Sequence, residues 1–132
     1  MMKVKNILAF VFLTTVFSPI LVAQTTNEIE IQHLESILKQ IPANCTVLDV
    51  RTEQEYHQGY IAGAKNYNYL AENFKEKVAV LDKNKTYYVY CFSGGRSSQA
   101  VADMQALGFT KVINVRGGIR AWTQAGYDIK NE

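Results

Sequence analysis

The sequence is poor in the residues that mark several large classes of protein. Its 132 residues include only two cysteines and two histidines, and these four residues show no metal-ligand spacing. The glycine fingerprint of dinucleotide-binding proteins does not occur. The formal net charge is +2 and no block of basic residues is present, which argues against nucleic acid as a partner. We therefore expect no metal, no cofactor and no bound nucleic acid.

Long apolar runs are missing as well, except near the N-terminus. There a basic start is followed by an uncharged apolar run, a helix breaker and a small residue: Lys3 and Lys5, Ile7–Phe17, Pro19 and Ala23. This order predicts a secretory signal peptide over residues 1–23. Residues 24–132 would then form one domain, because they contain no internal repeat or low-complexity segment. A domain of this length can bury a core of its own.

The signal peptide predicts export, in a bacterium to the periplasm. The alternative is an N-terminal membrane anchor, because Ile7 to Ala23 spans 17 residues, the lower limit for a membrane helix. Cleavage would remove two lysines and no acid, which leaves 12 basic and 12 acidic side chains. We then expect no stable membrane insertion, and an anionic substrate would have to be bound by local groups.

Short apolar strands alternate with helical patterns along the rest of the chain. The expected helices cover residues 29–41 (ending before Pro42), 52–59, 71–81, 97–108 and a short segment after 116, and the expected strands cover residues 45–50, the end of 60–69, 86–91 and 111–115. Such alternation indicates parallel pairing through right-handed crossovers. The predicted fold class is α/β, with a central parallel sheet of about five strands and helices on both faces.

The two cysteines occupy opposite ends of their expected strands. Cys45 begins one strand, four residues before Asp49, whereas Cys91 ends another. Four strand residues span roughly 13 Å, and a disulfide requires Cα atoms within about 7 Å. We therefore expect no disulfide, with Cys45 buried in the core and Cys91 as a free thiol.

The segment CFSGGRS, residues 91–97, joins the strand of Cys91 to a helix. Ser97 or Ser98 is expected to cap that helix, while Gly94 and Gly95 allow the backbone to curl with positive φ. A curled loop before a helix directs N–H groups inward and forms a cradle for an anion. Such a cradle beside Arg96 would lower the pKa of a thiol, and the guanidinium would offer its planar fork to an oxyanion.

Two longer segments carry a resemblance to a known family. VLDVRTEQEYHQGYIAGAKNYNY resembles the first signature of rhodanese-like (thiosulfate sulfurtransferase) domains, and YCFSGGRSSQAVADMQALGFTKVINVRGGIRAWTQAGYDI resembles their active-site loop and C-terminal signature. The resemblance covers about residues 29–130. It implies a single rhodanese-like domain in which Cys91 is the catalytic nucleophile. It also implies a substrate-binding loop made of Phe92, Ser93, Gly94, Gly95, Arg96 and Ser97.

The remaining motif residues are interpreted as structural. Asp49 and Arg51 follow the neighbouring strand and are expected to support the rim of the site, with Arg51 paired to Glu53 or Glu55. Gly117 and Gly118 are expected to permit close backbone approach, and Trp122 is expected to anchor the core. Where the family has histidine in its G-H-I motif, this sequence has Tyr60.

The resemblance implies a sulfurtransferase that moves a sulfane sulfur from a small anionic donor, such as thiosulfate or a polysulfide, to a thiol or cyanide, and the signal-peptide pattern implies that it is exported. The sulfur would be carried as a persulfide on Cys91. One alternative is a persulfide carrier for a partner protein, such as a redox or sulfur-relay protein, with little turnover of small molecules. Another is a phosphatase or arsenate-reductase-like enzyme, which the loop length opposes: four residues separate Cys91 from Arg96, whereas the related phosphatases have five.

Overall fold

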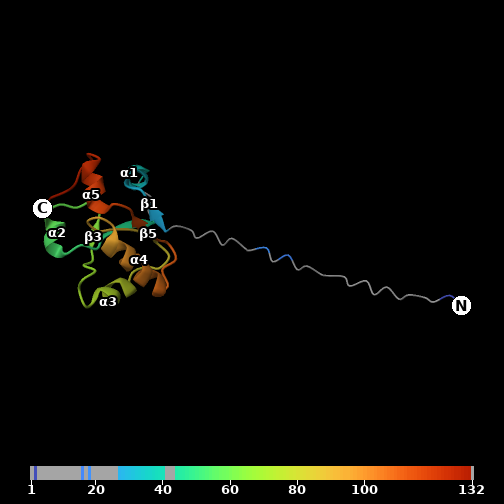
Figure 1. The fold of residues 1–132 in the computed structure, drawn as a ribbon. Helices are drawn as coiled ribbons and strands as arrows, with labels where there is room; N and C mark the ends of the chain where they lie inside the picture. Colours follow the sequence, from blue (N-terminus) through green and yellow to red (C-terminus); the bar gives the residue numbers. More distant parts are fainter. Residues whose placement is uncertain (1, 3–15, 17, 19–26, 41–43, 132) are drawn as a thin grey trace.

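In the computed structural model of the chain, residues 2, 16, 18, 27–40 and 44–131 are described, and a parallel five-stranded sheet lies at the centre of the domain (Figure 1). The strands, in the spatial order β1-β5-β4-β2-β3, are β1 (Glu28–Ile29), β5 (Val112–Val115), β4 (Thr86–Tyr90), β2 (Cys45–Asp49) and β3 (Lys65–Asn66). Every neighbouring pair is parallel. The predicted α/β class and parallel sheet are confirmed.

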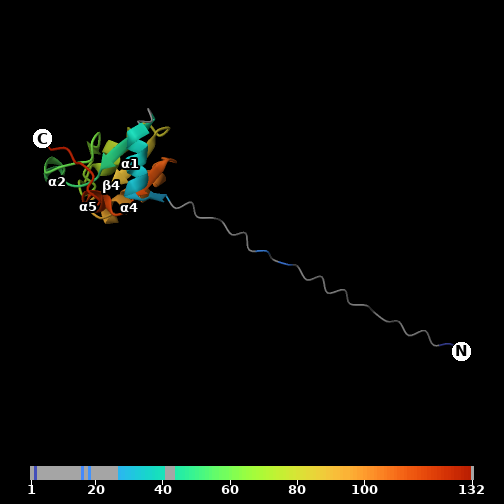
Figure 2. The ribbon, with the colours of Figure 1, turned by 90° about the horizontal axis from the view of Figure 1, so that it is seen from above.

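Within the described residues, four helices connect these strands and a fifth follows β5, and together they cover both faces of the sheet. They are α1 (Ile31–Gln40), α2 (Glu53–His57), α3 (Phe74–Ala79), α4 (Gly95–Ala106) and α5 (Gly118–Gln124). Helices α1 and α5 lie on one side of the sheet and α3 and α4 on the other (Figure 1), and in the view from above α1 lies over the sheet (Figure 2). The predicted placement of helices on both faces is confirmed.

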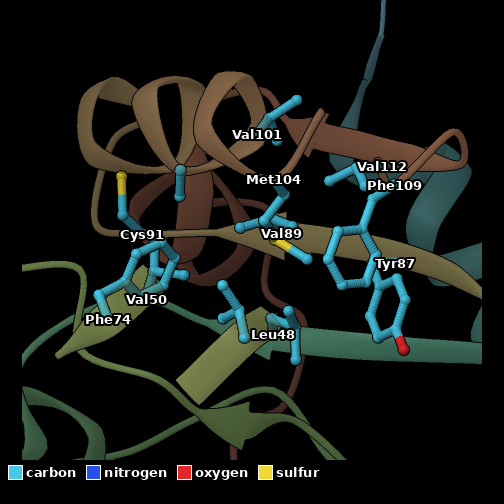
Figure 3. Packing of buried hydrophobic residues seen from close by; sticks show 12 residues of the cluster. Leu48, Val50, Phe74, Tyr87, Val89, Cys91, Val101, Met104, Phe109 and Val112 are labelled. Atoms are coloured by element: carbon cyan, nitrogen blue, oxygen red, sulfur yellow. The ribbon is translucent and has the colours of Figure 1, made fainter. Parts of the chain in front are cut away.

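Each face of the sheet has its own apolar cluster. Side chains of β2 and β4 pack with α3 and α4 in one cluster, which includes Leu48, Val89, Met104 and Phe109 (Figure 3). The second cluster lies under α1 and α5 and includes Trp122, which is 5% exposed and donates its Nε1–H to the Asp128 carbonyl at 2.9 Å. Burial of this apolar area is the main stabilising contribution to the fold, and the expectation for Trp122 is confirmed.

The start of the domain differs from the expected helix over residues 29–41. Glu28 and Ile29 form the edge strand β1, in register with Asn114 and Val115 of β5, and α1 begins at Ile31. Backbone pairing with β5 therefore overrides the helical spacing of Ile29. Helix α1 ends at Gln40, while Pro42 and most of residues 1–23 lie outside the described residues, as does the predicted cleavage site. No helix within the described ranges has the length and apolarity needed to cross a membrane.

The two cysteines lie at opposite ends of the neighbouring strands β2 and β4, as predicted. Cys45 is opposite Thr86 at the start of β4, whereas Cys91 follows Tyr90 at its far end, and no disulfide joins them. Cys91 is 2% exposed. Cys45 is only partly buried, so its predicted place in the core is wrong: it lies at the first position of β2, where the sheet is open to solvent.

The chain after β4 is fixed against α5 by two backbone hydrogen bonds. The N–H groups of Ile119 and Arg120 donate to the carbonyls of Cys91 at 3.0 Å and Phe92 at 2.9 Å. Gly118, with φ of 57°, lies so close that a Cβ there would overlap both carbonyl oxygens. The predicted close approach at this glycine is confirmed, and it positions the loop that follows Cys91.

We expect Gly118→Ala to destabilise the protein far more than the same replacement at Gly63. Gly63→Ala is the matched control, because Gly63 also has positive φ (82°) but a Cβ there meets nothing within 4 Å. The control should cost about 1 kcal/mol of unfolding free energy from backbone strain alone. Gly118→Ala should cost about 3 kcal/mol, because overlap with the loop adds to the strain. Equal losses in denaturant unfolding would show that the loop does not depend on this approach.

Candidate functional site

The loop after β4 curls at one glycine and enters α4 at once. Gly94 has φ of 114° and is the N-cap residue, and α4 begins at Gly95. Two details of the sequence interpretation are therefore wrong: neither Ser97 nor Ser98 caps the helix, and Gly95 has no positive φ. The earlier helix start places Ser97 in the first turn, where it is fully buried behind the loop.

Hydrogen-bond donors converge on the sulfur of Cys91. The Gly94 N–H lies 3.0 Å from Sγ and the Ser97 hydroxyl lies 3.4 Å from it, and the sulfur points toward α4 (Figure 3). Burial raises the pKa of the Cys91 thiol, but hydrogen bonds from the Ser97 hydroxyl and the N–H groups of Ser97, Gly94 and Ser93 outweigh it, so the pKa falls below its ordinary value. Hydrogen bonds to the charged form favour the thiolate, the nucleophilic form of cysteine.

Beside the loop lies an open cleft with partly apolar walls. The cleft measures about 310 Å³ and is lined by residues of α2, of the loop and of the chain from α5 onward, among them Phe92, Ile119 and Ile129. Phe92, which lines this cleft, is 48% exposed, and its neighbour Ser93 is exposed as well.

Arg96 reaches out of the loop to α2. Its Nη1 and Nη2 donate to Oε1 and Oε2 of Glu55 at 2.8 Å and 3.0 Å. This paired contact with Arg96 is the main reason that the pKa of Glu55 falls to about 2, with a further contribution from Thr52. The Thr52 hydroxyl accepts from the Glu55 N–H, and the two residues form a capping box at the start of α2. In this structure the fork of Arg96 binds Glu55, and the expected contact of that fork with an anion stays a prediction.

Asp49 and Arg51 form a buried ion pair beneath the site. Arg51 Nε donates to both Asp49 oxygens, and Nη2 donates to Asp49 Oδ2 at 2.6 Å and to the Gly59 carbonyl at 2.7 Å. Asp49 is fully buried and Arg51 is 5% exposed. The predicted pairing of Arg51 with Glu53 or Glu55 is wrong, because Asp49 lies two residues away on the same strand end and Glu55 already binds Arg96.

The sequence interpretation missed the partner of Arg96 and the walls of the cleft. A signal for Glu55 existed, since its capping-box position places it in the first turn of a helix that starts beside the catalytic edge of the sheet. Nothing comparable marks Ile119 or Ile129. Over the described parts of the chain, no three His, Cys, Asp or Glu side chains gather where they could hold a metal ion.

We expect Ser97→Ala to make Cys91 less reactive. The Ser97 hydroxyl donates to the sulfur and stabilises its charged form, so its removal raises the pKa of the thiol and moves the pH profile of alkylation upward. At a pH below the transition the rate should fall roughly tenfold, because a hydrogen bond to a charged group contributes about 1.5–3 kcal/mol. Ser98→Ala, an exposed neighbour on the same helix, should leave the profile unchanged. An unshifted profile for Ser97→Ala would contradict this assignment.

Comparisons with known proteins agree with the geometry of this site. Residues 32–125 match the family described as the rhodanese-like domain. The chain is 36% identical over 93 residues to Thiosulfate sulfurtransferase 16, chloroplastic, of Arabidopsis thaliana, covering 63% of this chain and 78% of that protein. It is 33% identical over 103 residues to a sulfurtransferase of Allochromatium vinosum, covering 78% of this chain and 94% of that protein.

Two further similarities concern a sulfur carrier and a solved structure. The chain is 40% identical over 77 residues to the putative sulfur carrier protein YrkF of Bacillus subtilis, covering 58% of this chain and 40% of that protein. The crystal structure of a rhodanese-related protein from Thermoplasma volcanium superposes with a TM-score of 0.70 at 34% identity, covering 80% of this chain and 98% of that one. With this fold and these relatives, the chain belongs to the rhodanese-like domain family of sulfurtransferases and sulfur carriers.

Proposed function

We propose that this protein is an exported sulfurtransferase whose nucleophile is Cys91. The observation that carries the proposal is the set of hydrogen bonds that converge on Sγ and lower the pKa of the thiol. A thiol with a lowered pKa ionises more readily and depends less on a separate general base. The similarity to named sulfurtransferases supports sulfur as the atom that is transferred.

In the first half-reaction the Cys91 thiolate attacks the outer sulfur of the donor. With thiosulfate, the new S–S bond forms as the S–S bond of the donor breaks, the electron pair leaves with sulfite, and the product is a Cys91 persulfide. The N–H groups that stabilise the thiolate can then stabilise the negative charge on the bound sulfur and on the leaving group. Thiosulfate or a polysulfide-type molecule is the proposed class of donor.

In the second half-reaction the outer sulfur of the persulfide passes to a thiol or to cyanide. The acceptor attacks that sulfur, the persulfide S–S bond breaks, and the Cys91 thiolate is restored, so the scheme is ping-pong. The curled loop presents backbone N–H groups rather than a titrating base, which suits two successive anions at one position.

A sulfur carrier is the second candidate function. The similarity to the putative sulfur carrier of Bacillus subtilis favours it. In this case Cys91 would load with one sulfur and release it only to a partner protein. The predicted signal peptide would place either activity outside the cytoplasm, and export is part of the proposal in both cases.

Loading and turnover of sulfur separate these proposals. After incubation with thiosulfate, mass spectrometry should detect one added sulfur atom on Cys91. The Cys91→Ser variant should lose this adduct and at least 99% of thiosulfate:cyanide turnover, roughly the factor expected for removing a nucleophile. Cys45→Ser is the matched control and should keep both. Loading without turnover would favour the carrier. Full activity of Cys91→Ser would refute the proposed mechanism.

A further inference from the structure

Two arginines near the loop, Arg96 and Arg51, are each paired with a carboxylate. Arg96 is held by Glu55, and Arg51 is held by Asp49. Each pair consists of one cation and one anion, so these four residues add no net charge to the site. The amides of the loop and the Ser97 hydroxyl are the groups that face an anion at Sγ. A donor with two negative charges would be repelled by a thiolate there, and neither the Arg96 nor the Arg51 guanidinium is free to offset that repulsion.

The Glu55–Arg96 pair is firmly built rather than a chance surface contact. The contact is bidentate, and both side chains are only about one quarter to one third exposed. Glu55 is also fixed from its own helix, because its carboxylate accepts from the hydroxyl of Thr52 at 3.0 Å. A guanidinium held in this way by a carboxylate must break two charge-assisted hydrogen bonds before it can turn to a substrate.

The cleft next to this pair offers space for an organic group. Glu55 forms part of its wall, and the apolar side chains of Phe92, Ile119 and Ile129 also line it. Phe92 belongs to the same loop as Cys91, and Ile119 donates its N–H to the Cys91 carbonyl. A volume of about 310 Å³ exceeds what thiosulfate needs and suits a small organic body.

We propose that Glu55 makes this site selective for an organic sulfur donor with at most one negative charge, such as an organic persulfide or thiosulfonate, whose apolar body lies in the cleft. Glu55 acts by holding Arg96 and is thus a positioning residue. The inference rests on the proposed function, because it takes Cys91 as the sulfur-accepting nucleophile.

Two donors that differ in one group test this selectivity. Benzenethiosulfonate has the sulfane sulfur of thiosulfate, but a phenyl ring replaces one charged oxygen. Its transfer balances in the same way: the Cys91 thiolate takes the outer sulfur, and the electron pair of the broken S–S bond leaves with benzenesulfinate. The readout is the ratio of kcat/KM for benzenethiosulfonate to kcat/KM for thiosulfate, measured above the pKa of Cys91. We expect a ratio of about ten for the wild type, because benzenethiosulfonate carries one negative charge less than thiosulfate and buries its phenyl ring in the cleft.

We expect Glu55→Gln to lower this ratio about fivefold. The freed Arg96 guanidinium attracts doubly charged thiosulfate more strongly than singly charged benzenethiosulfonate, so the KM for thiosulfate falls; at a solvated site one extra unit charge has about this effect. Glutamine also serves in a capping box, so α2 should stay folded, which circular dichroism and the melting temperature check. Glu53→Gln is the matched control: it removes the same charge from an exposed position on the same helix and should leave the ratio unchanged. An unchanged or increased ratio for Glu55→Gln would overturn the proposal.

The apolar wall is tested by Phe92→Ala. Loss of the ring should lower the same ratio about tenfold, mainly through a larger KM for benzenethiosulfonate. Val80→Ala, a truncation at an apolar residue that is 85% exposed and does not line the cleft, is the control. An unchanged ratio would show that the cleft does not hold the donor. If Cys91 accepts sulfur from neither donor, the proposed function itself fails; if it accepts sulfur from both and no variant moves the ratio, only this inference fails.

Discussion

The hydrogen bonds that converge on Sγ of Cys91 are the interaction on which the rest of the site depends. They exist because the chain curls at Gly94 and enters α4 immediately, so that the backbone and the Ser97 hydroxyl face the sulfur. The curl is held in turn by the backbone bonds from α5 to the carbonyls of Cys91 and Phe92. The absence of a side chain at Gly118 permits this contact, so the chemistry at β4 depends on packing at the start of α5.

Ionisation of the thiol and attachment of the loop to α2 depend on different groups, although one arginine could have served both. Ionisation of the thiol is assigned to amides and a hydroxyl that are fixed in the loop. Arg96 instead joins the loop to α2 through Glu55, while the buried pair of Asp49 and Arg51 ties the end of β2 to Gly59. A site of this kind stabilises the negative charge on sulfur with dipoles that need no rearrangement during the reaction, while Arg51 and Arg96 are both bound by carboxylates.

Much of this arrangement could be predicted from local sequence. The capping box of α2, the glycine curl and the position of Cys91 after β4 follow from residue types at short separations. The partners of Arg51 and Arg96 could not be predicted, because each depends on how one strand end or helix lies against another. Strand β1 was missed for a similar reason: only its pairing with β5 identifies two residues as a strand. The predicted signal peptide stays a prediction.

The most direct test of the account is an ultraviolet titration of the thiolate in the Cys45→Ser variant, in which Cys91 is the remaining cysteine. We predict one transition at a pH below that of the same protein unfolded in denaturant, because the loop donors stabilise the thiolate more than burial penalises it. A transition at or above the unfolded value would show that burial dominates and would contradict the claim that the loop donors lower the pKa of Cys91.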